Sequence, residues 1–341
     1  MGVCSDTLAG NPLMATAPEP NPRPSPRMDQ YYARPQRLVK VSARRRLNLL
    51  ILGEGSPTVI FAPGGGASTL EWARVQHPIS AKTRTVAYDN AGFGFSDPGP
   101  LPRTGSACVN DLRSALKAAD VAPPYVLVGW SLGGLHMRLF AFRHPEEVVG
   151  MVLVDSSTEH QGRRLFEVTG NPLFDEAQRA RHPEVRALRA KAIRVEKLAR
   201  EGALKPGTPE YDEFVGPPLP TVTPAVNAAR VAQFCSPARY RAMRSEMKHF
   251  MGVTSDEVAA ARRPLGDIPI IMLTASRLPP NLPLDKADAW REVLCSMHDE
   301  FAALSTRGVR RTVDAGHGIQ IEKPEVVIGA IEEVLARSRA R

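Results

Sequence analysis

The chain has 341 residues, of which 43% are hydrophobic and 23% charged, and its formal net charge is +8. This is the composition of an ordinary globular protein, and it excludes a wholly disordered or fibrous chain. At about 150 residues per domain, the length allows two domains or one large α/β domain with an insertion. No apolar run approaches the ~18 residues that a membrane-spanning helix needs. The N-terminus lacks the pattern of a secretory signal, so we expect a cytoplasmic protein that does not bind membranes.

Basic charge is concentrated at the start of the chain. Residues 1–46 contain eight Lys or Arg against three Asp or Glu, a balance of +5. No nucleic-acid-binding motif or aromatic interleaving accompanies these charges, so we interpret them as a solvated segment and expect no nucleic-acid partner. Residues 1–35 also contain seven prolines. Because repeated proline blocks helices and sheet ladders, residues 1–35 are predicted to be disordered.

The cysteines give no sign of a disulfide framework or a metal centre. Cys4, Cys108, Cys235 and Cys295 lie far apart, with no paired or zinc-binding spacing. We interpret them as reduced thiols, and we expect no metal site.

Strand and helix patterns alternate from Gln36 to Asp155. Short apolar runs predict strands at 37–41, 47–52, 58–62, 84–88, 125–128 and 148–154, and helical spacing predicts helices at 104–119 and 132–143. Residues 156–266 are richer in Arg, Ala, Glu and Pro and carry helical stretches at 183–200 and 237–251. Strand patterns return at 268–273 and 309–313, followed by an amphipathic helix at 324–337. The alternation predicts an α/β fold with a mostly parallel sheet, formed by residues 36–155 and 267–341 and interrupted by a helical lid, 156–266.

The segment Gly129-Trp130-Ser131-Leu132-Gly133 joins a buried predicted strand directly to a predicted helix. A serine in such a sharp turn needs glycine two positions away on either side, because a Cβ there would clash. The turn exposes the serine oxygen and places the Leu132 N–H at a helix start, where it can face a developing oxyanion. We therefore predict Ser131 as a nucleophile and Leu132 as an oxyanion donor, with Trp130 as a candidate for lining the pocket.

Three further segments complete a resemblance to the α/β-hydrolase superfamily. They are the glycine-rich stretch 62–68, the stretch Tyr88–Asp97, and Gly316-His317-Gly318. The resemblance covers residues 36–341 apart from the insertion, and the branch it favours contains lid-bearing bacterial serine esterases and C–C bond hydrolases. It implies the α/β-hydrolase fold, with a mostly parallel sheet flanked by helices, and catalytic residues in the order Ser, acid, His.

The base that this order requires is His317, because it follows the last predicted strand and precedes the closing helix. The acid is left open between two positions. Asp155 directly follows predicted strand 148–154 and is favoured, since a carboxylate there could hold Nδ1 of His317. Asp288 and Asp285, which come late after strand 268–273, are the alternatives.

A second oxyanion donor is expected in the loop after predicted strand 58–62. Similar proteins usually carry His-Gly at the start of this loop, whereas here Pro63 takes the place of the histidine. Backbone N–H groups bind the oxyanion, so we select Gly65, with Gly64 and Gly66 as rivals.

An apolar stripe in the insertion, formed by Met243, Met247, Phe250 and Met251, has helical spacing. It is typical of lid packing. A flexible Met-rich face above Ser131 would also suit a bulky apolar acyl or alcohol group, so Met243, Met247 and Phe250 are candidates for lining the pocket.

These residues predict a cofactor-free serine hydrolase that cleaves a carboxylic ester or lactone through an acyl-enzyme. Its expected partners are a small-molecule substrate and water. A C–C bond hydrolase, an acyltransferase or an amidase on the same three residues is the alternative, and a non-catalytic ligand-binding protein is a further one. Serine at the elbow argues against dehalogenase or epoxide-hydrolase chemistry, for which the superfamily uses aspartate. The sequence names neither the substrate nor the oligomeric state.

Overall fold

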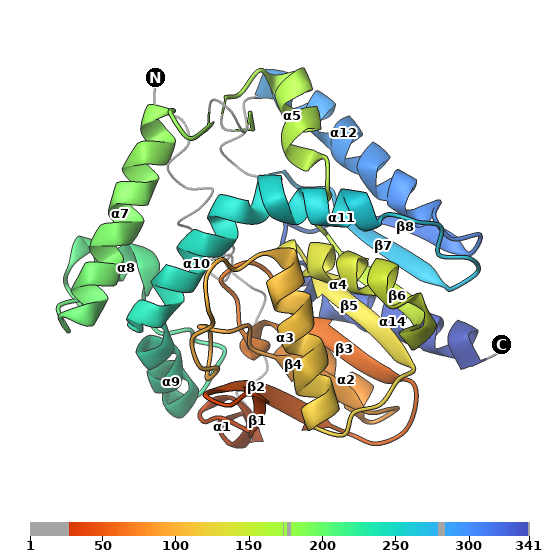
Figure 1. The fold of residues 1–341 in the computed structure, drawn as a ribbon, viewed down its shortest axis with the longest axis horizontal. Helices are drawn as coiled ribbons and strands as arrows, with labels where there is room; N and C mark the ends of the chain where they lie inside the picture. Colours follow the sequence, from red (N-terminus) through yellow and green to blue (C-terminus); the bar gives the residue numbers. More distant parts are fainter. Residues whose placement is uncertain (1–26, 173, 176–178, 279–283, 340–341) are drawn as a thin grey trace.

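An eight-stranded sheet organises the molecule (Figure 1). The computed structural model describes residues 27–172, 174–175, 179–278 and 284–339. In spatial order the strands are β1 (Arg37–Ser42), β2 (Arg45–Leu52), β4 (Thr85–Tyr88), β3 (Thr58–Ala62), β5 (Tyr125–Trp130), β6 (Val148–Val154), β7 (Ile270–Ala275) and β8 (Gly308–Val313). The β1–β2 and β2–β4 pairs are antiparallel and the other pairs are parallel. The carboxyl ends of β3 to β8 therefore lie at one edge, where sheets of this kind place their sites.

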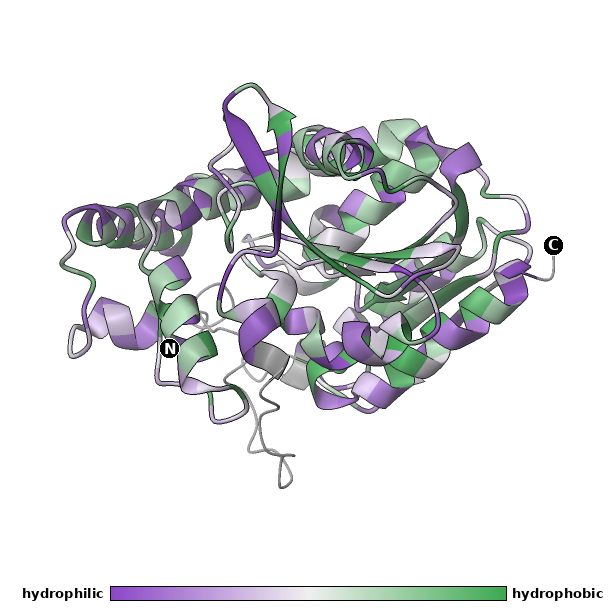
Figure 2. Cartoon of the chain, turned by 90° about the horizontal axis from the view of Figure 1, so that it is seen from below, coloured by the Kyte–Doolittle hydropathy of each residue, from purple (hydrophilic) through white to green (hydrophobic). Residues whose placement is uncertain are grey.

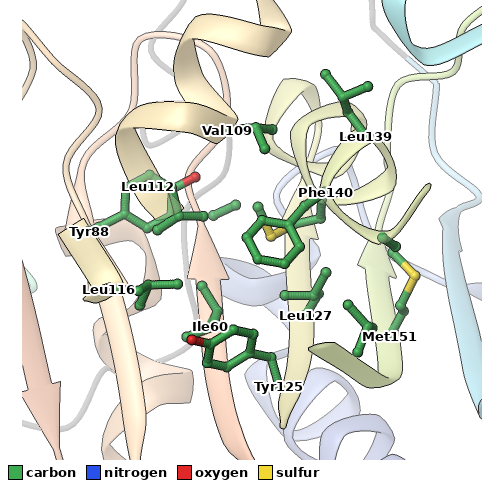
Figure 3. Close-up of a cluster of buried hydrophobic side chains, with 14 of the residues drawn as sticks. Ile60, Tyr88, Val109, Leu112, Leu116, Tyr125, Leu127, Leu139, Phe140 and Met151 are labelled. Atoms are coloured by element: carbon green, nitrogen blue, oxygen red, sulfur yellow. The ribbon is translucent and has the colours of Figure 1, made fainter. Parts of the chain in front are cut away.

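Helices cover both faces of the sheet, which is why the central strands are buried along their whole length. On one face, Ile60, Leu127 and Met151 of the strands pack against α3 (Gly105–Ala118) and α4 (Leu132–Arg143), as Figure 3 shows. Figure 2 shows the same strands as a hydrophobic layer between helices of mixed character. This core fixes the sheet edge to which the site residues are attached.

The opposite face is covered by α2 (Ala73–Ser80) and α14 (Pro324–Arg339). Strand residues that alternate with those of the first face, such as Phe61 and Val128, pack here against Trp72 and Ile331. This two-residue alternation is the side-chain period of a strand buried between two helical layers. The α/β architecture and the eight predicted strands are thus confirmed, each strand within a few residues of its predicted bounds.

The segment between β6 and β7 is a helical insertion. It contains α5 (Gln161–Thr169), α7 (Pro183–Arg200), α8 (Pro209–Phe214), α9 (Pro224–Phe234), α10 (Pro237–His249), η4 (Phe250–Thr254) and α11 (Ser255–Ala261). Four of these helices begin with proline, which lacks only an N–H that the first turn would leave unpaired. Part of the insertion has its own apolar cluster, in which Val195, Phe234 and Tyr240 are buried. In the described part of the chain, no helix is both long enough and apolar enough to cross a membrane.

The last helix of the insertion, α11, belongs to the main core. Val258 is fully buried in the cluster that contains α3 and α4, and α11 packs along α4. Helix α11 therefore packs with the α/β core, although it falls within residues 156–266.

An N-terminal helix, α1 (Arg27–Tyr32), lies within the segment that was predicted to be disordered. Tyr32 is buried with Leu50 of β2 and Val226 of α9, and Thr223 at the start of α9 bonds to the Asp29 carboxylate. For residues 27–35 the prediction of disorder is wrong, because two tyrosines follow the proline run and supply apolar surface for packing. Residues 1–26 lie outside the described residues.

Candidate active site

Ser131 lies in a strained turn between β5 and α4. Its φ is 53° and its ψ is −124°, a backbone conformation that residues other than glycine rarely adopt. Among the described residues, the other non-glycine positions with positive φ are Asp120 and Asp155. Two of these three are the predicted nucleophile and the favoured acid. Such strain costs about 1–3 kcal/mol per residue and persists where the surrounding structure enforces it.

Glycines at the turn make room for this conformation. A Cβ on Gly129 would lie 2.7 Å from Gly134 Cα, and one on Gly133 would lie 2.4 Å from the Pro63 carbonyl oxygen. A Cβ on Gly134 would lie 2.0 Å from Ser156 Oγ. Strand, helix and neighbouring loop therefore meet at backbone distance, as the sequence motif indicates.

His317 and Asp155 are hydrogen-bonded, although 162 positions separate them in the chain. His317 lies in the loop between β8 and α13 (Ile319–Glu322), and its Nδ1 is 2.7 Å from Asp155 Oδ2. The other carboxylate oxygen of Asp155 accepts the Ala275 N–H at 3.0 Å. An ionised carboxylate only accepts hydrogen bonds, so Nδ1 carries the proton and Nε2 is the basic nitrogen.

Trp130 connects this pair to the serine turn. Its Nε1 donates to the His317 carbonyl oxygen at 2.8 Å, and the two rings lie 5.3 Å apart. Trp130 directly precedes Ser131, and it pairs with Val154, the residue before Asp155. Ser131, Asp155 and His317 are thus attached to the same edge of the sheet. The His317 side chain is 46% exposed, and within the described part of the chain its Nε2 has no hydrogen bond.

The alternative acids lie elsewhere. Asp288 is on α12 (Leu284–Ala302), has a side chain that is 91% exposed and pairs with Arg291. Asp285 falls in the first turn of the same helix, and its side chain lies outside the described residues. Of the described carboxylates, it is Asp155 that bonds to His317.

The predicted oxyanion loop runs beside the serine turn. A Cβ on Gly65 would lie 3.3 Å from Leu132 Cδ2, and a Cβ on Gly64 would lie 2.8 Å from the Trp130 ring. Gly65 and Leu132, the two predicted donors, are therefore neighbours, and Trp130 borders the loop.

Two methionines of the apolar stripe cover this loop. A Cβ on Gly65 would lie 2.9 Å from Met247 Cε, and one on Gly66 would lie 3.5 Å from Met243 Sδ. Phe250, like Met247, packs against the edge of the main core cluster. Helix α10 thus lies over the glycine loop through Met243 and Met247.

Two charged residues of α10, Arg239 and Glu246, lie beside Gly66 of the glycine loop. Arg239 of α10 donates to the Gly66 carbonyl oxygen and stacks 3.7 Å above the Phe234 ring. Glu246, also on α10, is 2% exposed, and burial raises its pKa to about 7, although Arg103 and the nearby Gly66 N–H favour its charged form. Neither of its oxygens makes a hydrogen bond of standard geometry.

Two more carboxylates anchor the chain after the loop. Glu71 accepts the Ser68 N–H at 2.7 Å, and burial raises its pKa to about 7. Asp89 accepts the Thr69 and Phe95 N–H groups at 2.8 and 3.0 Å. Asp89 thus serves the turn structure.

Sequence reasoning missed several of these contacts. Arg239 and Glu246 stand in a charged helix where spacing alone shows no difference between them and their exposed neighbours. The Ala275 N–H is a backbone group and leaves no mark in the sequence. The buried His298 lies on α12, a helix that the sequence patterns do not predict.

One group among the described residues has the composition of a metal site: His144 with Glu146 and Glu147. It lies at the C-terminal end of α4, whereas Ser131 precedes the N-terminal end of that helix. Glu147 is already paired with Arg113. This group is therefore separate from the candidate active site.

Comparison with known proteins shows the family of this fold. The family model of the alpha/beta hydrolase fold matches residues 57–244, which is more than half of the chain. The chain belongs to the alpha/beta hydrolase family. The match includes β3 to β6, Ser131 and Asp155, so the sheet edge described above is the edge of an alpha/beta hydrolase.

Curated relatives match this alpha/beta hydrolase over about a third of its length. Protein YqjL of Bacillus subtilis is 37% identical over 103 residues, which are 30% of this chain and 41% of YqjL. The pimeloyl-acyl-carrier-protein methyl ester esterase of Chromobacterium violaceum is 36% identical over 113 residues, 33% of this chain and 42% of the esterase. The chain thus aligns with less than half the length of either relative.

A solved structure matches over most of the alpha/beta hydrolase. The epoxide hydrolase CorEH without ligand has a TM-score of 0.57 and 18% sequence identity, covering 88% of this chain and 98% of CorEH. At this identity the likeness concerns the fold.

Proposed function

We propose that this alpha/beta hydrolase is a serine hydrolase that cleaves a carboxylic ester or lactone. The observation that carries the proposal is the 2.7 Å hydrogen bond between His317 Nδ1 and Asp155 Oδ2, at the sheet edge that also bears the strained Ser131 turn. Each member of this set alone has a structural explanation. Together they supply a nucleophile, a base with its free nitrogen fixed, and a carboxylate that stabilises the charged base. The similarity to a methyl ester esterase supports the same class of substrate.

In the first half of the reaction, Ser131 Oγ attacks the carbonyl carbon while its proton moves to His317 Nε2. The carbonyl oxygen becomes an oxyanion and accepts the N–H groups of Leu132 and Gly65. His317 then gives its proton to the leaving alcohol oxygen as the carbon–oxygen bond breaks. This leaves the acyl group on Ser131.

In the second half, His317 takes a proton from water as the water oxygen attacks the acyl carbon. The carbon–oxygen bond to Ser131 breaks, the proton returns to Ser131, and the carboxylic acid leaves. Asp155 remains ionised throughout and stabilises the imidazolium each time it forms. With a lactone the alcohol and acid are one molecule, and the steps are the same.

Helix α10 suits an apolar substrate. Met243 and Met247 lie against Gly66 and Gly65, so a group bound at the oxyanion loop would contact two flexible thioether side chains. Thioether side chains adapt to irregular apolar shapes. We therefore expect better hydrolysis of esters with a bulky apolar acyl or alcohol group than of acetate esters.

The direct test is Ser131→Ala, measured with a series of nitrophenyl esters and lactones. The expected result is loss of turnover with unchanged thermal unfolding. Ser338→Ala is the matched control, because Ser338 lies in the last helix and its hydroxyl donates to the Leu335 carbonyl oxygen of that same helix. Retained hydrolysis by Ser131→Ala would refute the proposal.

A fluorophosphonate probe and product analysis separate the remaining classes. A serine hydrolase becomes labelled at Ser131, whereas a ligand-binding protein without catalysis does not. A competing alcohol or thiol that captures the acyl group in preference to water would instead identify an acyltransferase.

A further inference from the structure

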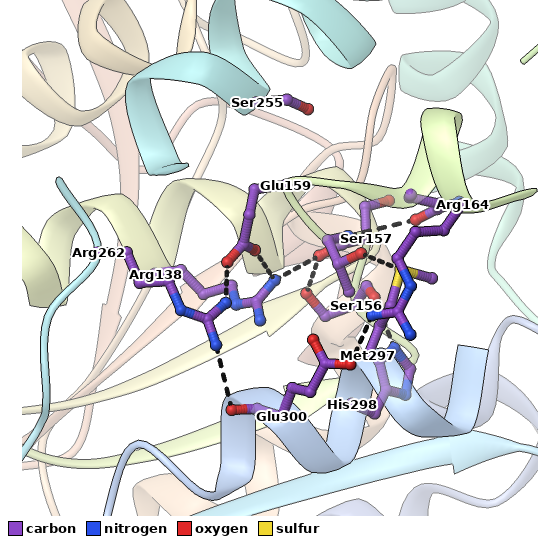
Figure 4. A network of polar contacts seen from close by, with 12 residues as sticks. Arg138, Ser156, Ser157, Glu159, Arg164, Ser255, Arg262, Met297, His298 and Glu300 are labelled. Atoms are coloured by element: carbon purple, nitrogen blue, oxygen red, sulfur yellow. Dashed lines mark hydrogen bonds and ion pairs between the residues drawn. The ribbon is translucent and has the colours of Figure 1, made fainter. Parts of the chain in front are cut away.

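His298 is a buried side chain that links Ser156, the residue after Asp155, to Thr274 on the neighbouring strand β7. It lies on α12, is fully buried and makes a hydrogen bond through each ring nitrogen. Its Nε2 is 2.8 Å from the Ser156 carbonyl oxygen, and its Nδ1 is 2.7 Å from Thr274 Oγ1 (Figure 4 shows His298 with Ser156).

The partners fix the protonation of the ring. A carbonyl oxygen only accepts, so Nε2 donates to Ser156 and Nδ1 accepts from the Thr274 hydroxyl. Burial lowers the pKa of His298 to about 4, which keeps the ring neutral at physiological pH. Both nitrogens are therefore occupied, and His298 is not available as a second base.

Both partners of His298 are adjacent to the contacts that place Asp155. Ser156 is the next residue in the chain, and Thr274 precedes Ala275, whose N–H donates to Asp155 Oδ1 at 3.0 Å. The Asp155 N–H in turn donates to the Leu273 carbonyl oxygen at 2.7 Å. With a φ of 39°, Asp155 has a conformation that its neighbours must enforce.

We propose that His298 is a positioning residue for Asp155: it holds Ser156 and Thr274 at a fixed separation and thereby aims the carboxylate at His317. This inference rests on the proposed function, since it assigns Asp155 as the acid. It predicts that loss of the His298 contacts acts on catalysis through Asp155 and through no other group. A purely structural histidine would instead change stability alone.

The sharpest variant is Thr274→Val, which removes one hydroxyl and keeps the shape of a β-branched strand residue. We expect kcat for a nitrophenyl ester to fall roughly 10–100-fold with little change in KM, because small displacements of catalytic groups have effects of this size. Thr274→Ser keeps the hydroxyl and should restore kcat. His298→Phe, which removes both contacts, should lower kcat further.

Ser305→Ala is the matched control. Its hydroxyl donates to the Ile268 carbonyl oxygen, so it also joins the α12 region to β7, but at the end away from Asp155. We expect this variant to lose stability and keep kcat.

A double-mutant cycle decides between positioning and structure. In an Asp155→Ala background, Thr274→Val should cause no further loss of kcat, because the group it positions is gone. An equal loss in both backgrounds, or an unchanged kcat in the wild-type background, overturns the proposal.

A spectroscopic measurement tests the inference even without turnover. In protein with ¹⁵N-labelled histidine, the Nδ1 proton of His317 that is shared with Asp155 should resonate far downfield. It should be lost or shifted in Thr274→Val and retained in Thr274→Ser and Ser305→Ala. If no ester is hydrolysed, the proposed function fails, and this resonance still tests the positioning. A resonance that Thr274→Val leaves unchanged overturns it.

Discussion

Glu159 is expected to contribute strongly to stability, because this carboxylate and its arginine partner Arg138 are both buried. Glu159 Oε2 is 2.7 Å from Arg138 Nη1, and both side chains are 1% exposed. Its other oxygen pairs with Arg262 (Figure 4). Although burial opposes ionisation, these two arginines keep the pKa of Glu159 below its usual value. Glu159 follows β6 and Arg262 precedes β7, so one carboxylate ties together both ends of the insertion.

The perturbation is Glu159→Gln, which keeps the shape and removes the charge. Arg138 then stays buried beside the Ser157 carbonyl oxygen and the Phe301 ring but without its paired carboxylate, and breaking a buried ion pair costs about 3–5 kcal/mol. That is a large part of the ~5–15 kcal/mol that stabilises a typical protein. At ~2.1 cal/mol/K per residue, unfolding of a 341-residue chain has an entropy near 0.7 kcal/mol/K, so the melting temperature should fall by roughly 4–7 °C.

Urea unfolding and calorimetry measure this effect, with Glu167→Gln as the control. Glu167 is also paired with an arginine, Arg163, but their side chains are 60% and 69% exposed. Exposed pairs of this kind contribute about 0–1 kcal/mol. If Glu159→Gln loses no more than Glu167→Gln, the reasoning from burial is refuted.

Two further predictions concern pH and the N-terminal helix. Glu246 has a pKa of about 7 in the folded protein and about 4.5 when unfolded, so the unfolded chain releases this proton first as pH rises. The protonated Glu246 side chain therefore stabilises the folded protein at low pH, and about 3 kcal/mol of this stability is lost as the pH rises from ~4.5 to ~7. In urea unfolding, the free energy of unfolding of Glu246→Gln should increase relative to wild type over that range. A difference that does not change with pH would contradict this. Tyr32→Ala removes a side chain that is buried between β2 and α9. Chymotrypsin should then cut after Tyr31 faster than in wild type or in Gln30→Ala, whose side chain is exposed. An equal cutting rate in all three would show that Tyr32 does not anchor α1.

Much of the sheet could be predicted from sequence, because its strands are short apolar runs bounded by glycine, proline and charge. β5 and the turn at Ser131 were the clearest case: the close approaches of Gly129 and Gly133 are backbone contacts that only glycine permits. His317 followed from its place after the last strand. Each of these features depends on residues that are close together in the chain, so a short sequence pattern is enough to predict it.

Features that depend on distant packing could not be predicted. Helix α12 follows a proline-rich stretch and was missed, so His298 had no structural context although it is fully buried. Helix α1 was missed because the prolines before it dominate the composition, whereas Tyr32 is held by partners in β2 and α9. The choice between Asp155 and Asp288 required knowing which carboxylate reaches His317, which is a property of the folded sheet edge.

At that edge of the sheet, backbone hydrogen bonds hold the two strained residues in place. Ser131 and Asp155 both have positive φ, and each is held by backbone bonds to the neighbouring segment: the Ser131 N–H donates to Val154, and the Asp155 N–H donates to Leu273. These bonds extend the β5–β6–β7 pairing beyond the regular strands, so sheet register sets the conformation of both residues. A change that shifts β6 relative to β7 would therefore displace Asp155 more than Ser131. For this reason the contacts around Ser156 and Thr274 are the place where distant substitutions should affect catalysis most.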